Sequence, residues 1–534
     1  MQTASHRARM GYKRTGLSSA FRLDNLSESI SYSTCKAAKC QNSFSSHNNP
    51  IVVGAKGSEV RIYSASATIL MILALGQPGC GTDRQPMMPE KHSSIVNSFR
   101  QEKQLTDNRS GHILTNIGVW SRDSAWIVYD TRSDPAGEVF DGSRIEMVNI
   151  ETGEVKVLHE TRNGAHCGVA TFSPTSPRIV FIRGPENPKP DWQYGPSHRQ
   201  GVLVEPARPG EMMNLDARDL TPPFTPGALR GGSHVHVFSA DGQWVSFTYE
   251  DHLLSAFQTQ TKENDVNLRN IGVSVPLGPV RVKKTHQRNH DGEYFSVLVT
   301  RTTANPKPGS DEIKRAFEEG WVGSNGYLRA DGLRQHRALA FQGLVVTSAG
   351  EPISEVFIVD LPEDVSIPGE GPLAGTEKRC PAPPKGTVQR RLTLTADRKH
   401  PGLAGPRHWL RSSPDGSRIS FLMKDEHGIV QLWTISPNGG APVQVTRNPW
   451  GIASAFTWSP DGVAIAHVID NSVAVSNART GVTTRLTPRS QDAQAPRPEA
   501  CVFSPDGSRI AYVRRTNIEG RDYNQIWTVL LKQK

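Results

Sequence analysis

The sequence predicts an all-β protein: a single β-propeller of about seven four-stranded blades, with six or eight blades as the alternatives. Three observations predict it. A Ser-Pro-Asp-Gly motif recurs at the spacing of propeller blades, alternating apolar and polar strands flank its copies, and the 534 residues include 47 Gly and 38 Pro. Short strands joined by tight turns need that many turn residues, and a single propeller can reach this length.

Three regular copies of the motif lie near the C-terminus, at 413–416, 459–462 and 504–507, with their Asp residues 46 and 45 positions apart. In such a turn, Pro presets φ, the Asp side chain hydrogen-bonds to the nearby backbone, and Gly takes the positive φ that closes a hairpin. Degenerate copies at Ser121, Ser173, Ser239 and His290 bring the number of blade starts to seven.

A Leu-Thr or Val-Thr pair often ends the outer strand of a unit, and the pair also occurs before the first unit, at Leu105-Thr106. The chain ends on an alternating strand at 525–530 that has no successor. We therefore expect the strand at 101–106 to complete the last blade and close the ring, which leaves no open sheet edge.

The fourth unit is irregular, because 124 residues separate Asp291 from Asp415. We interpret about 303–390 as an insertion that either covers a functional face or plugs one end of the channel. Ser310 is expected to cap a short helix within it, and the acids at 311–312 and 318–319 are interpreted as helix-end or solvated charges.

The N-terminal part carries a targeting pattern. Residues 67–76 form an apolar run of signal-peptide length, with Arg61 before it and Cys80 shortly after. Because Cys80 lies where a bacterial lipoprotein signal carries its lipidated residue, we interpret 60–80 as a signal peptide starting at Val60. A buried apolar strand in a disordered leader is the alternative. Residues 1–59 are then a non-native or disordered extension, 81–100 a linker and 101–534 the propeller.

Composition excludes several functions. The formal net charge is +9, but residues 1–63 contribute +6 of it and no aromatic-lined basic stripe follows, so we expect no nucleic-acid partner. The cysteines form no CxxC pair, and Cys167 and Cys501 are interpreted as buried free thiols. The chain lacks Gly-x-Ser-x-Gly and Walker A motifs, which argues against a hydrolase domain or a nucleotide-binding loop.

Candidate site residues cluster near the start of the predicted inner strands, where propellers commonly bind ligands. His234 and His408 lie five residues before the motif serine, and His166 lies seven before it. His236 is expected on the same strand face as His234 because side chains on a strand alternate with period two. Further candidates are His252, His198-Arg199, Arg230 and Arg407.

Converging imidazoles could bind Zn²⁺ or Mn²⁺, and Arg230 and Arg407, the candidates for a catalytic role, could pair with the carboxylate of an acidic ligand. Two alternatives stay open at this point. The histidines could simply hydrogen-bond neighbouring blades, or the mouth could be a protein-docking surface.

Unusual strings carry a family resemblance over about residue 105 to the C-terminus. They include 163–166 (NGAH), 184–188 (GPENP), 229–238 (LRGGSHVHVF), 309–313 (GSDEI), 318–323 (EEGWVG) and 406–409 (PRHW). The chain resembles the YidR-like proteins, TolB-like propellers grouped as a domain of unknown function. The resemblance implies the fold and no established activity.

The His-x-His pair is also loosely similar to the metal site of oligogalacturonate lyases, seven-bladed propellers. That resemblance implies a metal that neutralises a uronate carboxylate while a base removes a proton. The glutamine expected just ahead of the pair is replaced by Gly231.

The sequence therefore predicts an extracytoplasmic bacterial protein, periplasmic or lipid-anchored, that binds a ligand or protein partner at the His-lined mouth as a monomer. The alternatives are a metal-dependent lyase or hydrolase acting on acidic carbohydrate and a TolB-like scaffold for envelope proteins. Whether it is an enzyme stays open.

Overall fold

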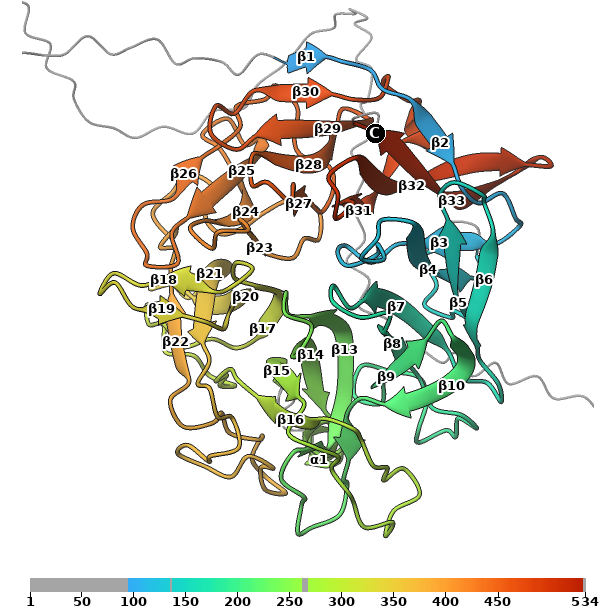
Figure 1. Ribbon diagram of the computed structural model, residues 1–534. Helices are drawn as coiled ribbons and strands as arrows, with labels where there is room; N and C mark the ends of the chain where they lie inside the picture. The colour runs from blue at the N-terminus through green and yellow to red at the C-terminus, as the bar shows by residue number, and fades with distance from the viewer. Residues whose placement is uncertain (1–94, 135–136, 262–267, 532–534) are drawn as a thin grey trace, which may run out of the picture. The chain divides into compact units, whose positions relative to one another are not determined.

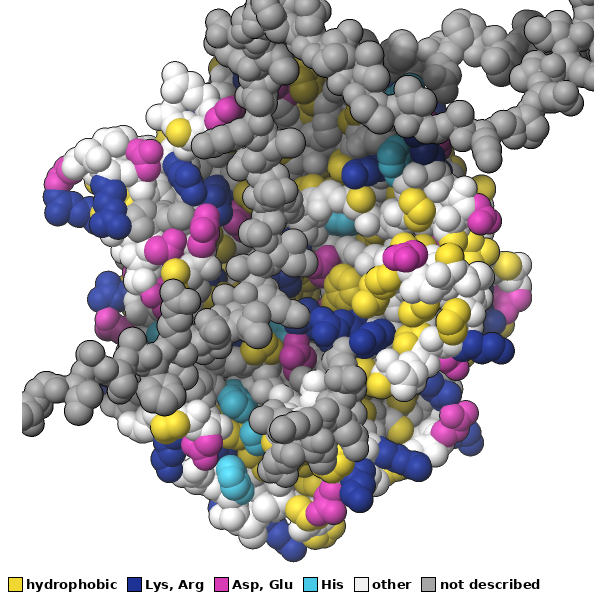
Figure 2. Space-filling model, turned by 180° about the vertical axis from the view of Figure 1, so that it is seen from behind, with side chains coloured by type: hydrophobic (Ala, Val, Ile, Leu, Met, Phe, Trp, Pro, Cys, Tyr) yellow, Lys and Arg dark blue, Asp and Glu magenta, His cyan; other side chains and the backbone are white. Residues whose placement is uncertain are grey.

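The protein is a seven-bladed β-propeller, with the blades arranged in a ring (Figure 1). The computed structural model describes residues 95–134, 137–261 and 268–531. From behind, Lys and Arg side chains gather near the middle of the ring (Figure 2). No helix in the described ranges is long and apolar enough to cross a membrane. The predicted signal peptide and Cys80 lie outside these ranges.

Each blade is an antiparallel sheet of four strands, which are named in order from the inner strand outwards; the sheet of blade 6 also carries β1 (Ile95–Asn97) as a fifth strand, parallel to β30 (Thr483–Arg485). Blade 1 is β3 (Gly111–Ile113), β4 (Trp126–Arg132), β5 (Arg144–Asn149) and β6 (Val155–Glu160). Blade 2 is β7 (Cys167–Phe172), β8 (Ile179–Arg183), β9 (Gln200–Glu205) and β10 (Arg208–Asn214). Blade 3 is β13 (Gly231–Phe238), β14 (Val245–Asp251), β15 (Asn270–Val275) and β16 (Phe295–Leu298).

The second half of the ring follows the same plan. Blade 4 is β17 (Ala316–Trp321), β20 (Ala338–Val346), β21 (Pro352–Asp360) and β22 (Val388–Arg391). Blade 5 is β23 (Arg411–Ser412), β24 (Ile419–Lys424), β25 (Val430–Ile435) and β26 (Val443–Gln444). Blade 6 is β27 (Thr457–Trp458), β28 (Ala464–Ile469), β29 (Ser472–Asn477) and β30 (Thr483–Arg485). Blade 7 is β31 (Pro496–Phe503), β32 (Arg509–Ile518), β33 (Arg521–Leu530) and β2 (Glu102–Gln104).

Smaller elements decorate the blades. They are β1 (Ile95–Asn97), the parallel pair β11 (Ala217–Arg218) and β12 (Ala228–Leu229), the hairpin β18 (Tyr327–Leu328) and β19 (Arg334–Gln335), the helix α1 (His252–Thr261), and a 3-10 turn at Asp492–Gln494. The helix lies in the connection between the second and third strands of blade 3.

The Ser-Pro-Asp-Gly motif forms the predicted turn between the first two strands of a blade. In blade 5, the Ser413 hydroxyl donates to Asp415 (2.5 Å), and the Asp415 carboxylate also accepts the backbone N–H of Ser417 (3.0 Å). Gly416 has φ of 75° and its N–H bonds the Ser413 carbonyl at 2.9 Å, so the turn needs a residue without a side chain.

Ring closure by the N-terminal strand is confirmed. The strand β2 pairs antiparallel with β33, with Glu102 opposite Val529, and the Thr106 hydroxyl accepts the N–H of Ile526 at 2.9 Å. The same hydroxyl contact recurs where Thr393, Thr446 and Thr487 end other blades, at 2.8–3.0 Å. The recurring Leu/Val-Thr pair thus buries an apolar side chain and satisfies a backbone donor of the neighbouring strand.

The blade boundaries differ from the sequence prediction at blade 4. The stretch at 303–390, interpreted as an insertion, contains most of the four strands of a regular blade. His290 and Gly292 form isolated bridges to Arg218 and Val280, so the copy at 290–292 is part of a loop between β15 and β16. The number of blades is still seven: the copy at 290–292 starts no blade, but blade 4 starts without a copy of the motif.

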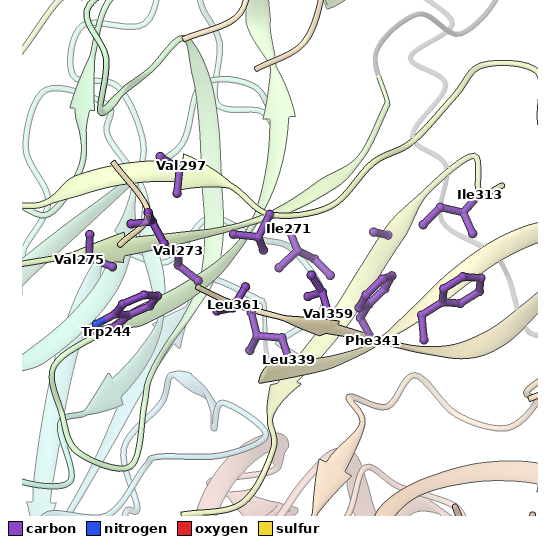
Figure 3. Close-up of a cluster of buried hydrophobic side chains, with 14 of the residues drawn as sticks. Trp244, Ile271, Val273, Val275, Val297, Ile313, Leu339, Phe341, Val359 and Leu361 are labelled. Atoms are coloured by element: carbon purple, nitrogen blue, oxygen red, sulfur yellow. The ribbon is translucent and has the colours of Figure 1, made fainter. Parts of the chain in front are cut away.

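The helix expected after Ser310 is absent. Pro308–Ser310 form a turn, and the chain then runs into β17. The reason is packing: Ile313 and Ala316 are fully buried in an apolar cluster between blades 3 and 4 (Figure 3), which includes Phe341 and Val359. Burial of these side chains in an interblade core outweighs the local helix-capping preference.

Candidate functional site

Three neighbouring inner strands carry the same distortion. The pairing register shifts after Gly168 in β7, after His234 in β13 and after Phe317 in β17. At each shift lies a non-glycine residue with positive φ: Val169 (58°), Val235 (59°) and Glu318 (59°). Such conformations cost about 1–3 kcal/mol each and concentrate at functional sites, while bulges re-aim nearby side chains.

The bulge at Val235 separates the two histidines that the sequence predicts on one face. Ser233 donates to Asp216 at 3.1 Å, and His236 lies beside the same carboxylate next to Gly201. Residues three apart share a face here because the bulge adds one residue to the strand. His234 lies near Arg199, Arg269 and Arg407, whose charges act on its ring, and these four residues are called the mouth below. The bulge breaks the two-residue alternation from which a shared face for His234 and His236 was predicted.

His234 is 4% exposed, and its Nδ1 has no hydrogen-bond partner among the described residues. Burial, followed by the charges of Arg199, Arg269 and Arg407, holds its pKa well below 6.5. The ring is therefore neutral at physiological pH and can both donate and accept a hydrogen bond. The buried His236 ring has its pKa lowered to about 3 by burial.

The three arginines come from different blades. Arg199 immediately precedes β9, Arg269 immediately precedes β15, and Arg407 lies just before β23. Arg269 pairs with Glu250 (Nε–Oε1 2.9 Å), and Arg407 pairs with Glu318 (Nε–Oε1 2.9 Å).

Arg199 differs from the other two. Its guanidinium lies over the rings of Phe140 (4.7 Å) and Tyr194 (4.9 Å), and no ion pair or hydrogen bond engages its side chain within the described part of the chain. Burial lowers its pKa, and Tyr194 and Glu250 oppose that effect. The positively charged guanidinium is therefore held at the mouth by its contacts with these two aromatic rings.

Two predicted site residues have structural roles instead. Arg230 is 1% exposed, donates to Asp251 (2.8 Å) and to the carbonyl oxygens of Thr376 and Arg379, and so anchors the long loop between β21 and β22. His408 bonds the Pro406 carbonyl through Nδ1 (2.9 Å) and accepts the N–H of Leu422 at Nε2 (3.2 Å). Both side chains are thus committed to contacts within the protein.

The other predicted histidines make contacts of their own. His166 is half-buried, with its ring edge against Tyr194 (5.4 Å). His252 begins α1 and shares a hydrogen bond with His198 (Nδ1–Nε2 3.0 Å), and both rings pack on Trp192. Burial lowers the pKa of His252 to about 4. In the described residues no group of three or more His, Cys, Asp or Glu could hold a metal ion, so the predicted histidine set does not fit Zn²⁺ or Mn²⁺.

Polar side chains also cross the channel itself. Arg411 of blade 5 donates to Asn116 of blade 1, and since blades 5 and 1 are not neighbours this bond spans the channel. Glu319, 1% exposed, accepts from Thr248 (3.0 Å), and burial raises its pKa to about 7. The acids at 318–319, interpreted as helix-end or solvated charges, lie instead in the inner strand β17 of blade 4.

Sequence reasoning missed Arg269, Glu250 and Glu318 at this mouth. Glu250 lies on the second strand of blade 3 and Arg269 directly before the third, so their distance from the motif gave no signal. The predicted buried thiols are confirmed, as Cys167 and Cys501 are buried and free.

The fold and the site together define a seven-bladed β-propeller of four-stranded blades with a histidine and three arginines at one mouth. Residues 166–290 match the family described as "Protein of unknown function (DUF3748)". The chain is 49% identical over 423 residues to "Uncharacterized protein YidR" of Escherichia coli (strain K12), covering 78% of this chain and 96% of that protein. The chain belongs to the YidR family.

Solved propellers are similar at low identity. An oligogalacturonate lyase in complex with manganese is 12% identical with a TM-score of 0.47, covering 83% of this chain and 96% of that one. A putative TolB from Agrobacterium tumefaciens is 14% identical with a TM-score of 0.34, covering 73% and 99%. Neither similarity bears on activity.

Proposed function

We propose that the protein is an extracytoplasmic propeller that binds a ligand at the mouth around His234. The observation that carries this proposal is the unpartnered Nδ1 of His234, buried beside the strained Val235. An unsatisfied buried polar atom costs about 1–3 kcal/mol, and a residue in a strained conformation costs a similar amount.

The position of these features supports the same proposal. The three bulges lie on adjacent blades, and the arginines converge on the same mouth from blades 2, 3 and 5. Residues far apart in the chain that converge on a strained, polar mouth are typical of a binding site.

A thermal-shift screen of a metabolite library tests the proposal. Wild-type protein, His234→Ala and a control, His467→Ala, are compared; His467 is also buried, with Nδ1 unpartnered among the described residues, but it lies in blade 6, where its Nε2 bonds Ser476 (2.7 Å). A ligand at a hundred times its Kd stabilises by about 2.7 kcal/mol, which raises Tm by a few degrees. We expect compounds that shift wild type and His467→Ala but leave His234→Ala unchanged. Hits that shift all three proteins equally, or a library without hits, contradict the proposal.

The alternative of a metal-dependent lyase or hydrolase acting on acidic carbohydrate has less support, because His408 and Arg230 are already engaged. Metal analysis of the purified protein tests it. Stoichiometric Zn or Mn that is lost in His234→Ala favours the enzyme. A metal content that is unaffected by this change argues against it.

A further inference from the structure

We propose that the ligand of this mouth is an anion whose carboxylate or phosphate group is held by the guanidinium of Arg199, next to His234. This inference rests on the proposed function and names the chemical class that the site selects. It follows from the charge balance at the mouth, from the aromatic support of Arg199, and from the contrast between Arg199 and the buried Arg230.

The charges at the mouth do not balance. Arg199, Arg269 and Arg407 all lie close enough to His234 to lower its pKa, whereas only Glu250 and Glu318 pair with members of this group. Each glutamate forms its ion pair with a different arginine, so among the described residues Arg199 has no ion pair, although the nearby charge of Glu250 raises its pKa. A mouth with an excess of one sign of charge attracts ligands of the opposite sign.

Arg199 is held in place by aromatic contacts that leave its donors uncommitted. Phe140 and Tyr194 are stacked on each other (5.3 Å, 15°), and the guanidinium lies over both. Its Nε is buried without a partner among the described residues. A planar guanidinium offers parallel N–H groups that match a carboxylate or phosphate, and a side chain fixed in advance loses less entropy on binding.

Arg230 is an arginine with a structural role, and its hydrogen bonds differ from those of Arg199. Its guanidinium contacts one carboxylate and two carbonyl oxygens, all from the protein. Arg199 forms its hydrogen bonds through the backbone, since its carbonyl accepts from Arg218 (2.6 Å) and from the N–H of Ser233 (3.2 Å). The guanidinium of Arg199 can therefore be removed without breaking a hydrogen bond within the described part of the protein.

Calorimetric titration with three probes tests the inference: inorganic phosphate, malonate and, as a neutral probe, glucose. The variants are Arg199→Gln and the control Arg329→Gln, an exposed arginine on the β18–β19 hairpin that pairs with Asp331 (3.0 Å). We expect phosphate or malonate to bind wild type and the control, with affinity falling as NaCl rises. Arg199→Gln should weaken that binding about tenfold to a hundredfold, as the loss of a charged hydrogen bond predicts. Whichever anion binds more tightly identifies the acid group.

Arg199→Lys keeps the charge but removes the paired donors, so an intermediate loss is expected, and this variant decides the question if Arg199→Gln does not fold. The inference is overturned if neither anion binds, or if Arg199→Gln binds as wild type does. His234-dependent binding of neutral compounds only would refute the anion while leaving the ligand site in place. The absence of any His234-dependent ligand would refute both.

Discussion

Arg230→Met should destabilise the propeller strongly while leaving ligand binding at the mouth intact. Arg230 and Asp251 are 1% and 0% exposed, and the substitution leaves the Asp251 carboxylate buried without its cation. Removing one partner of a buried pair costs about 3–5 kcal/mol, and two hydrogen bonds to loop carbonyls, those of Thr376 and Arg379, are lost as well. Asp251 also accepts the N–H of Leu254 (3.0 Å), so the start of α1 should be disturbed.

Urea unfolding monitored by tryptophan fluorescence measures this effect. Arg329→Met is the control, because Arg329 forms an exposed pair with Asp331 (47% and 45% exposed) and should cost less than about 1 kcal/mol. The double variant Arg230→Met/Asp251→Asn should recover part of the lost free energy of unfolding, because the buried carboxylate charge at position 251 is no longer present. A loss under about 1 kcal/mol for Arg230→Met, or a specific loss of ligand binding in a stable variant, refutes the structural role.

Three further outcomes are expected. Deleting residues 95–104 removes β1 and β2, so blade 7 loses its outer strand, and unchanged cooperative unfolding would contradict closure of the ring. Burial raises the pKa of Glu319 to about 7, against 4.5 in the unfolded chain, so between these pH values the native state binds more protons than the unfolded state. The free energy of unfolding should therefore fall by about 2–3 kcal/mol as pH rises from 4.5 to 7. Glu319→Gln should flatten that pH dependence, and an unchanged profile would argue against a buried acid. Finally, we expect Cys80→Ala to abolish metabolic labelling with palmitate and release the protein from membranes, and labelling that persists would contradict the lipoprotein prediction.

The sequence was sufficient for the architecture because local chemistry repeats in every regular blade. A turn such as 413–416 needs Pro, Asp and Gly at fixed positions, and Thr106 must satisfy a backbone donor when it closes the ring. Blade 4 has no such signature, since the hairpin β18–β19 replaces the short turn between its first two strands. The boundary was misplaced there for that reason.

The site was less predictable because it depends on backbone distortion and distant contacts. Valine seldom takes positive φ, so nothing in the sequence marks Val235 as a bulge, and the two-residue period put His236 on the wrong face. Arg269 and Arg407 are far apart in the sequence and lie near His234 only because the blades form a ring. His234, in contrast, was predicted from its register alone, and its role in binding stays a prediction.

A crystal structure of the protein soaked in tungstate, a heavy tetrahedral anion, tests the anion site at the mouth most directly. We predict an anomalous peak within hydrogen-bond distance of the Arg199 guanidinium and beside the His234 ring, and its loss in Arg199→Gln crystals. Peaks confined to exposed arginines on other faces, with none at this mouth, would contradict binding of an anion by Arg199.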